Sequence, residues 1–242
     1  LFEKIVMYQS IHFNAKPRRT TNASKPEVLE KLRQIVGAEN VLGVMMPSPF
    51  SSRGSVEDSI AFGKNFGMPL VERPITGAFE VLTKQMHLTN PTRGGESLAA
   101  ENLQSRLRGN ILMTVSNAEG RLLLSTGNKS ELAVGYSTLY GDMVGGFALL
   151  KDVFKTDVFR LSRHLNDRMG REVIPVTTIE RPPTAELRAD QRDDQSLPPY
   201  ELLDPVLEAY VELDRSREEL LEAAAAAAVG RPPAPAARPG TN

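Results

Sequence analysis

From about residue 24, stretches with apolar residues at helical spacing alternate with short, continuous apolar runs. The predicted strands cover 40–46, 69–75 and 121–125, and the predicted helices cover 24–37, 55–66, 77–87 and 97–116. Strands that alternate with helices predict an α/β fold. We expect a doubly wound, mainly parallel sheet with helices on both faces.

The pattern is weaker at both ends of the chain. Leu1–Tyr8 fits either a strand or part of a helix, and we treat residues 1–23 as a divergent N-terminal segment. Residues 202–221 predict one amphipathic helix. From 223 to 242 an alanine run passes into Pro- and Gly-rich sequence, which predicts a disordered, low-complexity tail. The α/β domain is therefore expected over 24–222.

Composition narrows the classes of function. The net charge is −1, so neither nucleic acid nor a membrane is an expected partner. There are no cysteines, which excludes disulfides and cysteine nucleophiles, and the three histidines are far apart. Without a signal-peptide pattern or an apolar run near the ~20 residues that span a bilayer, we expect a cytoplasmic protein.

Two loops directly follow predicted strands. Ligands of parallel sheets bind beyond the carboxyl ends of strands, which singles out Pro47–Arg53 and Ser125–Glu131. In the second loop Thr126 offers a hydroxyl, Lys129 a partner for phosphate, and Glu131 a carboxylate for Mg²⁺ or a ribose. A polar turn that caps a helix is the alternative interpretation of the same residues.

The stretch that follows makes the signal specific. The run Ser125-Thr-Gly-Asn-Lys-Ser-Glu131, continued by Gly135-Tyr-Ser-Thr-Leu-Tyr-Gly-Asp142, resembles the synthetase domain of glutamine-dependent NAD synthetases, in the N-type ATP pyrophosphatase family. Further matches lie in the same order at 41–52, 101–110, 150–156, 179–191 and 196–204. The resemblance covers about 37–216 and implies an adenine nucleotide alpha hydrolase-like fold.

The resemblance also implies a reaction and its site. ATP, with Mg²⁺, would adenylate the carboxylate of deamido-NAD, and ammonia would convert the acyl-adenylate to NAD and AMP. By the resemblance, ATP would contact Thr126, Lys155 and Thr184, and Glu131 would also lie near Mg²⁺. Deamido-NAD would contact Asn102, Arg106 or Arg108, Glu131, the run Tyr136, Ser137, Thr138 and Leu139, and Asp142. A homodimer is also implied.

Some of these residues have plain structural alternatives. Arg106 and Arg108 are also consistent with solvated charges on a helix. Lys155 is consistent with a lysine on a helix surface, and Asn102 with a polar residue on a helix face. For each, both interpretations stay open at the level of sequence.

The sequence also departs from the family pattern. A Ser-Gly-Gly-x-Asp-Ser pyrophosphate loop is expected near 20–25, where this chain has Thr-Thr-Asn-Ala-Ser-Lys, and Asn14–Arg19 replaces the apolar strand before it. The family's basic C-terminal segment and its amidase domain have no counterpart here. Ammonia would then come from solution or from a separate or lost glutamine amidase. These departures predict poor turnover by this chain alone.

Three alternatives to an active NAD synthetase domain follow. The chain could be a catalytically impaired nucleotide-binding pseudoenzyme, or a truncated fragment of an NAD synthetase. A different ATP pyrophosphatase, such as a GMP synthetase or a tRNA thiolation enzyme, is disfavoured by the segments 125–142 and 186–204, which resemble the dinucleotide side of NAD synthetases.

Overall fold

The computed structural model describes residues 6–9, 40–88 and 98–228. The described residues divide into two compact units, with the boundary between Ser196 and Leu197. The strands of the first unit are β1 (Val6–Gln9), β2 (Val41–Met45), β3 (Leu70–Glu72), β4 (Leu122–Ser125) and β5 (Phe147–Ala148). Its helices are α2 (Arg53–Phe66), α3 (Thr76–Gln85), α4 (Leu98–Glu119), α5 (Lys129–Ala133), α6 (Lys155–Met169), α7 (Val176–Glu180) and the short 3-10 turn η2 (Asp193–Gln195).

The strands described in the first unit make one sheet in the order β3-β2-β1-β4-β5. The pairs β2–β3 and β4–β5 are parallel, whereas β1 is antiparallel to both β2 and β4. Four strands therefore run in one direction, as the mainly parallel prediction requires, and the central strand is the exception. Its last residue, Gln9, pairs with Val41 and Leu122, at the amino ends of β2 and β4.

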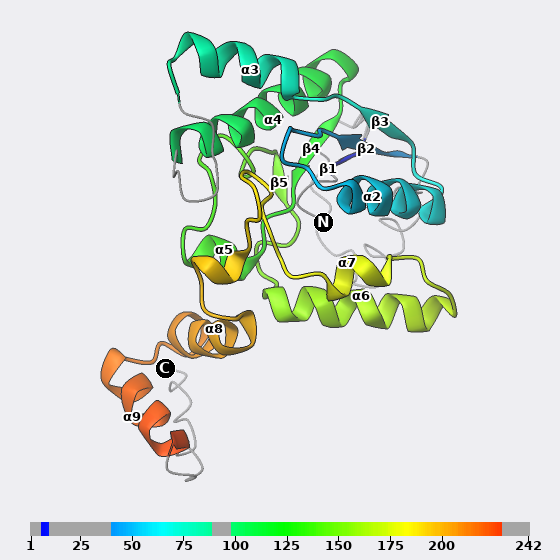
Figure 1. Ribbon diagram of the computed structural model, residues 1–242. Helices are drawn as coiled ribbons and strands as arrows, with labels where there is room; N and C mark the ends of the chain where they lie inside the picture. The colour runs from blue at the N-terminus through cyan, green and yellow to red at the C-terminus, as the bar shows by residue number, and fades with distance from the viewer. Residues whose placement is uncertain (1–5, 10–39, 89–97, 229–242) are drawn as a thin grey trace, which may run out of the picture. The chain divides into compact units, whose positions relative to one another are not determined.

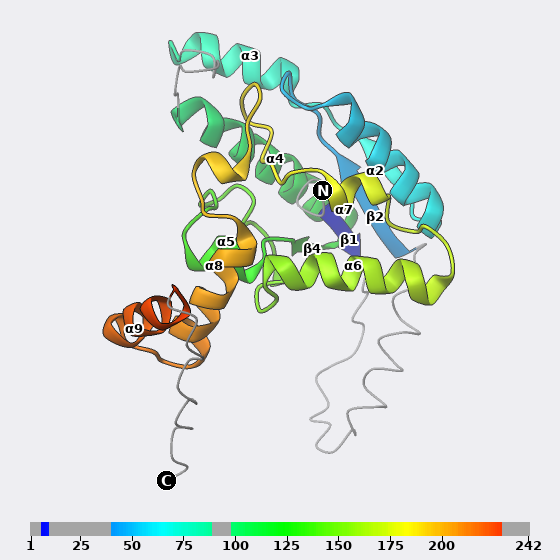
Figure 2. The same cartoon turned by 60° about the horizontal axis from the view of Figure 1, so that its bottom comes forward.

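Two apolar clusters lie on opposite faces of this sheet. Alternate residues of β2 point to opposite faces, so Leu42 and Val44 pack with α4, whereas Val41 packs with α2 and α7. Figures 1 and 2 show α3 and α4 on one side of the sheet and α6 and α7 on the other. The predicted α/β architecture with helices on both faces is confirmed.

Local signals explain where α2 begins and ends. The side chain of Ser52 caps the helix by accepting a hydrogen bond from the backbone N–H of Ser55. At the other end Gly67 adopts a left-handed conformation (φ 68°) that closes the last turn. The helix starts two residues earlier than the prediction, and the predicted strand over 69–75 shortens to β3. The helix predicted over 24–37 and the segment 10–23 lie outside the described residues.

The second unit corrects one prediction. The single helix expected over 202–221 is instead α8 (Tyr200–Leu207), a π-helical turn η3 (Glu208–Glu212) and α9 (Arg217–Ala228). The chain breaks before α9 because Ser216 and Glu219 exchange hydrogen bonds and start a new helix. The alanine run, predicted to begin the tail, continues α9 as far as Ala228, consistent with the high helix propensity of alanine. None of the helices described in either unit is long and apolar enough to cross a membrane.

Candidate active site

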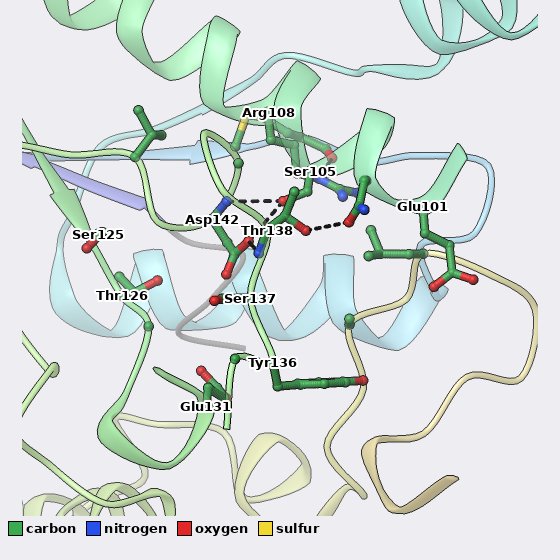
Figure 3. A pocket seen from close by; sticks show the side chains of 18 of the residues that line it. Glu101, Ser105, Arg108, Ser125, Thr126, Glu131, Tyr136, Ser137, Thr138 and Asp142 are labelled. Carbon is green, nitrogen blue, oxygen red and sulfur yellow. Dashed lines mark hydrogen bonds between the residues drawn. The ribbon is translucent and has the colours of Figure 1, made fainter. Parts of the chain in front are cut away.

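A cavity of about 230 Å³ opens where β2 and β4 end. Met46 follows β2, and Ser125 ends β4, so the cavity lies at the carboxyl edge of the parallel strands. Figure 3 shows Ser125 and Thr126 on one side of it, Glu101 on the opposite side, and residues of α4 along the top. The loop at 135–144 and the segment 185–191 complete the wall.

The cavity collects most of the predicted site residues. Those that line it are Asn102, Arg108, Thr126, Glu131, Tyr136, Ser137, Thr138 and Asp142. Arg106 and Leu139 do not: both are exposed, and the Arg106 Nε donates to the Leu139 carbonyl at 3.2 Å. Of the two arginines left open by the sequence, the structure places Arg108 in the cavity.

A hydrogen-bond network fixes the loop after α5 against α4. Asp142 Oδ1 accepts from the Thr138 backbone N–H at 2.6 Å and from Ser105 Oγ at 3.1 Å. Thr138 Oγ1 in turn donates to Asn102 Oδ1 at 2.9 Å. Each partner fixes the rotamer of the next, so the polar atoms that face the cavity are already oriented without ligand.

Glycines allow this loop to approach the helix closely. A Cβ atom on Gly109 would lie 2.7 Å from the Tyr140 carbonyl oxygen and 3.1 Å from that of Gly141. A Cβ atom on Gly141 would lie 2.8 Å from the Ser105 Cβ. Backbone therefore packs directly on backbone here, and a side chain at either position would move the loop out of the cavity wall.

Glu131 is both a cavity residue and a structural one. Asn128 caps α5 and forms a capping box with Glu131, whose carboxylate also accepts from Lys155 Nζ at 2.8 Å. Both charged side chains are at least nine-tenths buried. The ion pair joins the start of α5 to the start of α6 and fixes the carboxylate beside Thr126 at the cavity floor (Figure 3).

Arg108 is the cation that enters the cavity from α4. Its Nε donates to the Met46 carbonyl at 3.2 Å, whereas the buried Nη2 has no hydrogen-bond acceptor among the residues that the structure describes. Burial lowers the pKa of the guanidinium from its ordinary value to about 10, although the Glu186 carboxylate favours the charged form. Arg108 is thus a charged donor with bonding capacity left for an anionic ligand.

A second, smaller cavity of about 40 Å³ contains the other two predicted ATP contacts. Lys155 and Thr184 line it together with Arg181 and Glu186. The segment 183–187 separates the two cavities, because Ala185 and Leu187 line the first and Thr184 and Glu186 line the second. The predicted ATP residues are therefore divided between them, with Thr126 in the larger one.

Sequence reasoning missed several polar residues of these walls. Ser105 and Glu101 lie one and two turns before Arg108, on the α4 face toward the cavity, and this spacing is visible in the sequence once the helix is assigned. Glu186 and Gln191 come from an irregular segment, and no periodicity marks them.

Mg²⁺ prefers several oxygen ligands. Across 6–9, 40–88 and 98–228, no three acidic or histidine side chains form a group that could hold a metal ion. The carboxylate of Glu131 is already bonded to Lys155. The described residues do not make a magnesium site, so Glu131 as a metal ligand stays a prediction.

Comparison with known proteins identifies the family. The family model described as NAD synthase matches residues 28–229. The chain belongs to the NAD synthase family. It is 48% identical over 187 residues to the glutamine-dependent NAD(+) synthetase of Thermotoga maritima, covering 77% of this chain and 32% of that protein. Identity to the Synechocystis enzyme of the same name is 50% over 190 residues, which is 78% of this chain and 34% of the relative.

A solved structure agrees with these matches. The glutamine-dependent NAD+ synthetase from Acinetobacter baumannii, in complex with ADP, superposes with a TM-score of 0.57 at 40% identity, over 81% of this chain and 34% of that one. The chain thus spans about a third of the length of the relatives it matches. The resemblance to an NAD synthetase domain is confirmed.

Proposed function

We propose that the chain is the synthetase part of a glutamine-dependent NAD synthetase and converts deamido-NAD to NAD with ATP and ammonia. The observation that carries this proposal is the single cavity wall built from the STGNKSE and YSTLYGD runs, at the carboxyl edge of β2 and β4. Family membership and the relatives' names support it.

In the first step, a carboxylate oxygen of deamido-NAD attacks the α-phosphorus of ATP, and the bond to the β-phosphate oxygen breaks, releasing pyrophosphate. In the second, the ammonia nitrogen attacks the acyl carbon, the bond from that carbon to the AMP oxygen breaks, and the nitrogen loses one proton to solvent. The chain's task is to hold two anionic substrates in line. Arg108 supplies positive charge, Thr126 a hydroxyl, and the Asn102–Thr138 pair fixed polar atoms.

A specific observation supports a second candidate, a domain that binds the dinucleotide but turns over slowly. No Ser-Gly-Gly-x-Asp-Ser run occurs anywhere in the sequence. In addition, β1 ends at Gln9, which pairs with Val41 and Leu122 at the amino ends of β2 and β4, whereas the cavity lies at the carboxyl ends of these strands. Loss of backbone donors to a charged transition state is expected to lower kcat by about 10² or more.

One experiment separates the two candidates. The purified chain is incubated with ATP, Mg²⁺, deamido-NAD and an ammonium salt, and NAD and pyrophosphate are followed, with deamido-NAD binding measured by calorimetry. Turnover supports the synthetase proposal. Binding without product supports the slow domain, and the absence of both binding and product contradicts both candidates. A homodimer and a separate amidase as ammonia source stay predictions.

Arg108→Met tests the role of the arginine in the cavity, and Arg106→Met, two residues along the same helix, is the matched control. We expect Arg108→Met to weaken deamido-NAD binding about tenfold, as for loss of one charge-assisted hydrogen bond. The melting temperature should not fall, because the variant removes a buried charge with an unbonded Nη2. Equal effects of the two substitutions on binding would show that Arg108 has no special role.

A further inference from the structure

The carboxylate of Glu186 anchors the segment that separates the two cavities. Glu186 Oε1 accepts from Ser52 Oγ at 2.8 Å and from Ser55 Oγ, and Oε2 accepts from the Ser52 backbone N–H at 3.2 Å. Ser52 is the N-cap of α2, so the carboxylate sits on the positive end of a 14-residue helix. Glu186 itself is only 6% exposed.

Neighbouring contacts attach the same stretch to both sides of the site. Arg181 reaches α2 through Asp58, at 2.8 Å, and Ser55, at 3.2 Å. On the other side the Leu187 carbonyl accepts from Gln104 Nε2 of α4 at 2.7 Å. Glu186 thus lies between an anchor on α2 and an anchor on α4.

The backbone at Glu186 has an uncommon conformation for a residue with a side chain. Its φ is 47°, a left-handed value that is unfavourable for a residue with a side chain. Residues in this region persist where surrounding contacts over-determine them, and they cluster at functional sites. The turn at Glu186 directs Thr184 to the second cavity and Leu187 to the first, and the Thr184 Oγ1 accepts the Glu186 N–H at 3.1 Å.

We propose that Glu186 is a positioning residue: its carboxylate binds the N-terminus of α2 and thereby fixes residues 183–187 as the wall shared by the two substrate cavities. The side chain reaches Ser52, which belongs to the candidate loop Pro47–Arg53 after β2. It therefore couples that loop to Thr184, the predicted ATP contact. The role in substrate binding rests on the proposed function, whereas the role in fixing the segment does not.

The test compares Glu186→Ala and Glu186→Gln with Glu180→Ala, which removes the same side chain from an exposed position at the end of α7. Hydrogen exchange is followed in peptides covering 181–193. We expect Glu186→Ala to speed exchange there about tenfold, while peptides from α4 and β4 keep the wild-type rate. Glutamine retains one acceptor oxygen for Ser52 and Ser55 and should restore part of the protection.

Unchanged exchange of 181–193 in Glu186→Ala would overturn the proposal. A uniform rise across the whole chain would do so too, because it would assign Glu186 to global stability. If the alanine variant does not fold, Glu186→Gln decides by the same comparison, with faster exchange confined to 181–193 as the supporting result.

Calorimetry with ATP and Mg²⁺ adds the substrate readout. We expect Glu186→Ala to weaken ATP binding about tenfold and Glu180→Ala to leave it unchanged. Faster exchange in 181–193 with wild-type ATP affinity would overturn the link to the substrate. A wild-type chain that binds no ATP would contradict the proposed function, while the exchange comparison would still decide whether Glu186 fixes the segment.

Discussion

Replacing Glu131 by glutamine is expected to lower the free energy of unfolding by about 3 kcal/mol, because it removes one charge of a buried ion pair. The carboxylate contacts Lys155 Nζ at 2.8 Å, and the two side chains are 7% and 10% exposed. Glutamine has the same shape but removes the negative charge that contacts the Lys155 ammonium. Urea unfolding of the wild type and the variant measures the difference.

A double-mutant cycle provides the control. Lys155→Met alone should lower the free energy of unfolding by a similar amount, since the Glu131 charge stays buried. The double variant should be nearly as stable as the wild type, because neither charge remains. Strictly additive losses would contradict the ion-pair explanation. The result also bears on function, because a ligand or metal that takes the Glu131 carboxylate has to share it with Lys155.

Gly109→Ala is the second change with a large expected effect. Alanine normally stabilises a helix by about 1 kcal/mol relative to glycine. Here its Cβ would lie 2.7 Å from the Tyr140 carbonyl oxygen, and a backbone atom cannot swing aside as a side chain can. We expect a net loss of about 1–2 kcal/mol of stability from overpacking. Deamido-NAD binding should weaken by more than tenfold, because the loop at 138–142 leaves the cavity wall.

Gly77→Ala is the matched control for this substitution. Gly77 lies in the first turn of α3, and a Cβ atom there would meet nothing within 4 Å. Gly77→Ala should therefore raise the melting temperature slightly and leave deamido-NAD binding unchanged. Thermal unfolding and calorimetry of both variants test the pair of expectations. A Gly109→Ala protein as stable as Gly77→Ala would show that the loop at 138–142 does not pack tightly against Gly109.

Much of the fold could be predicted because it depends on local signals. The apolar run before Pro47 became β2, and the Ser52 cap and Gly67 delimit α2. The helix predicted over 97–116 is present as α4, although it contains Gly109, and glycine is unfavourable inside a helix. The structure explains this glycine, because the backbone of Tyr140 and Gly141 packs directly against it.

The errors and omissions have a common physical origin. The direction of β1 depends on pairing with β2 and β4, which are far away in the sequence. The position of Glu186 depends on a helix end 134 residues earlier. The break before α9 is the exception: Ser216 and Glu219 form a capping box that the sequence displays, and the apolar pattern across 202–221 concealed it.

The distance along the chain between Ser52 and Glu186 has a consequence for how the protein is made. Contacts with such large sequence separation form only after a long loop has closed, and the entropy of closure delays them relative to local structure. During synthesis, α2 and α4 can form as soon as they emerge, but the wall between the two cavities cannot exist until residue 186 has left the ribosome. A nascent chain therefore has its secondary structure well before it has a binding site.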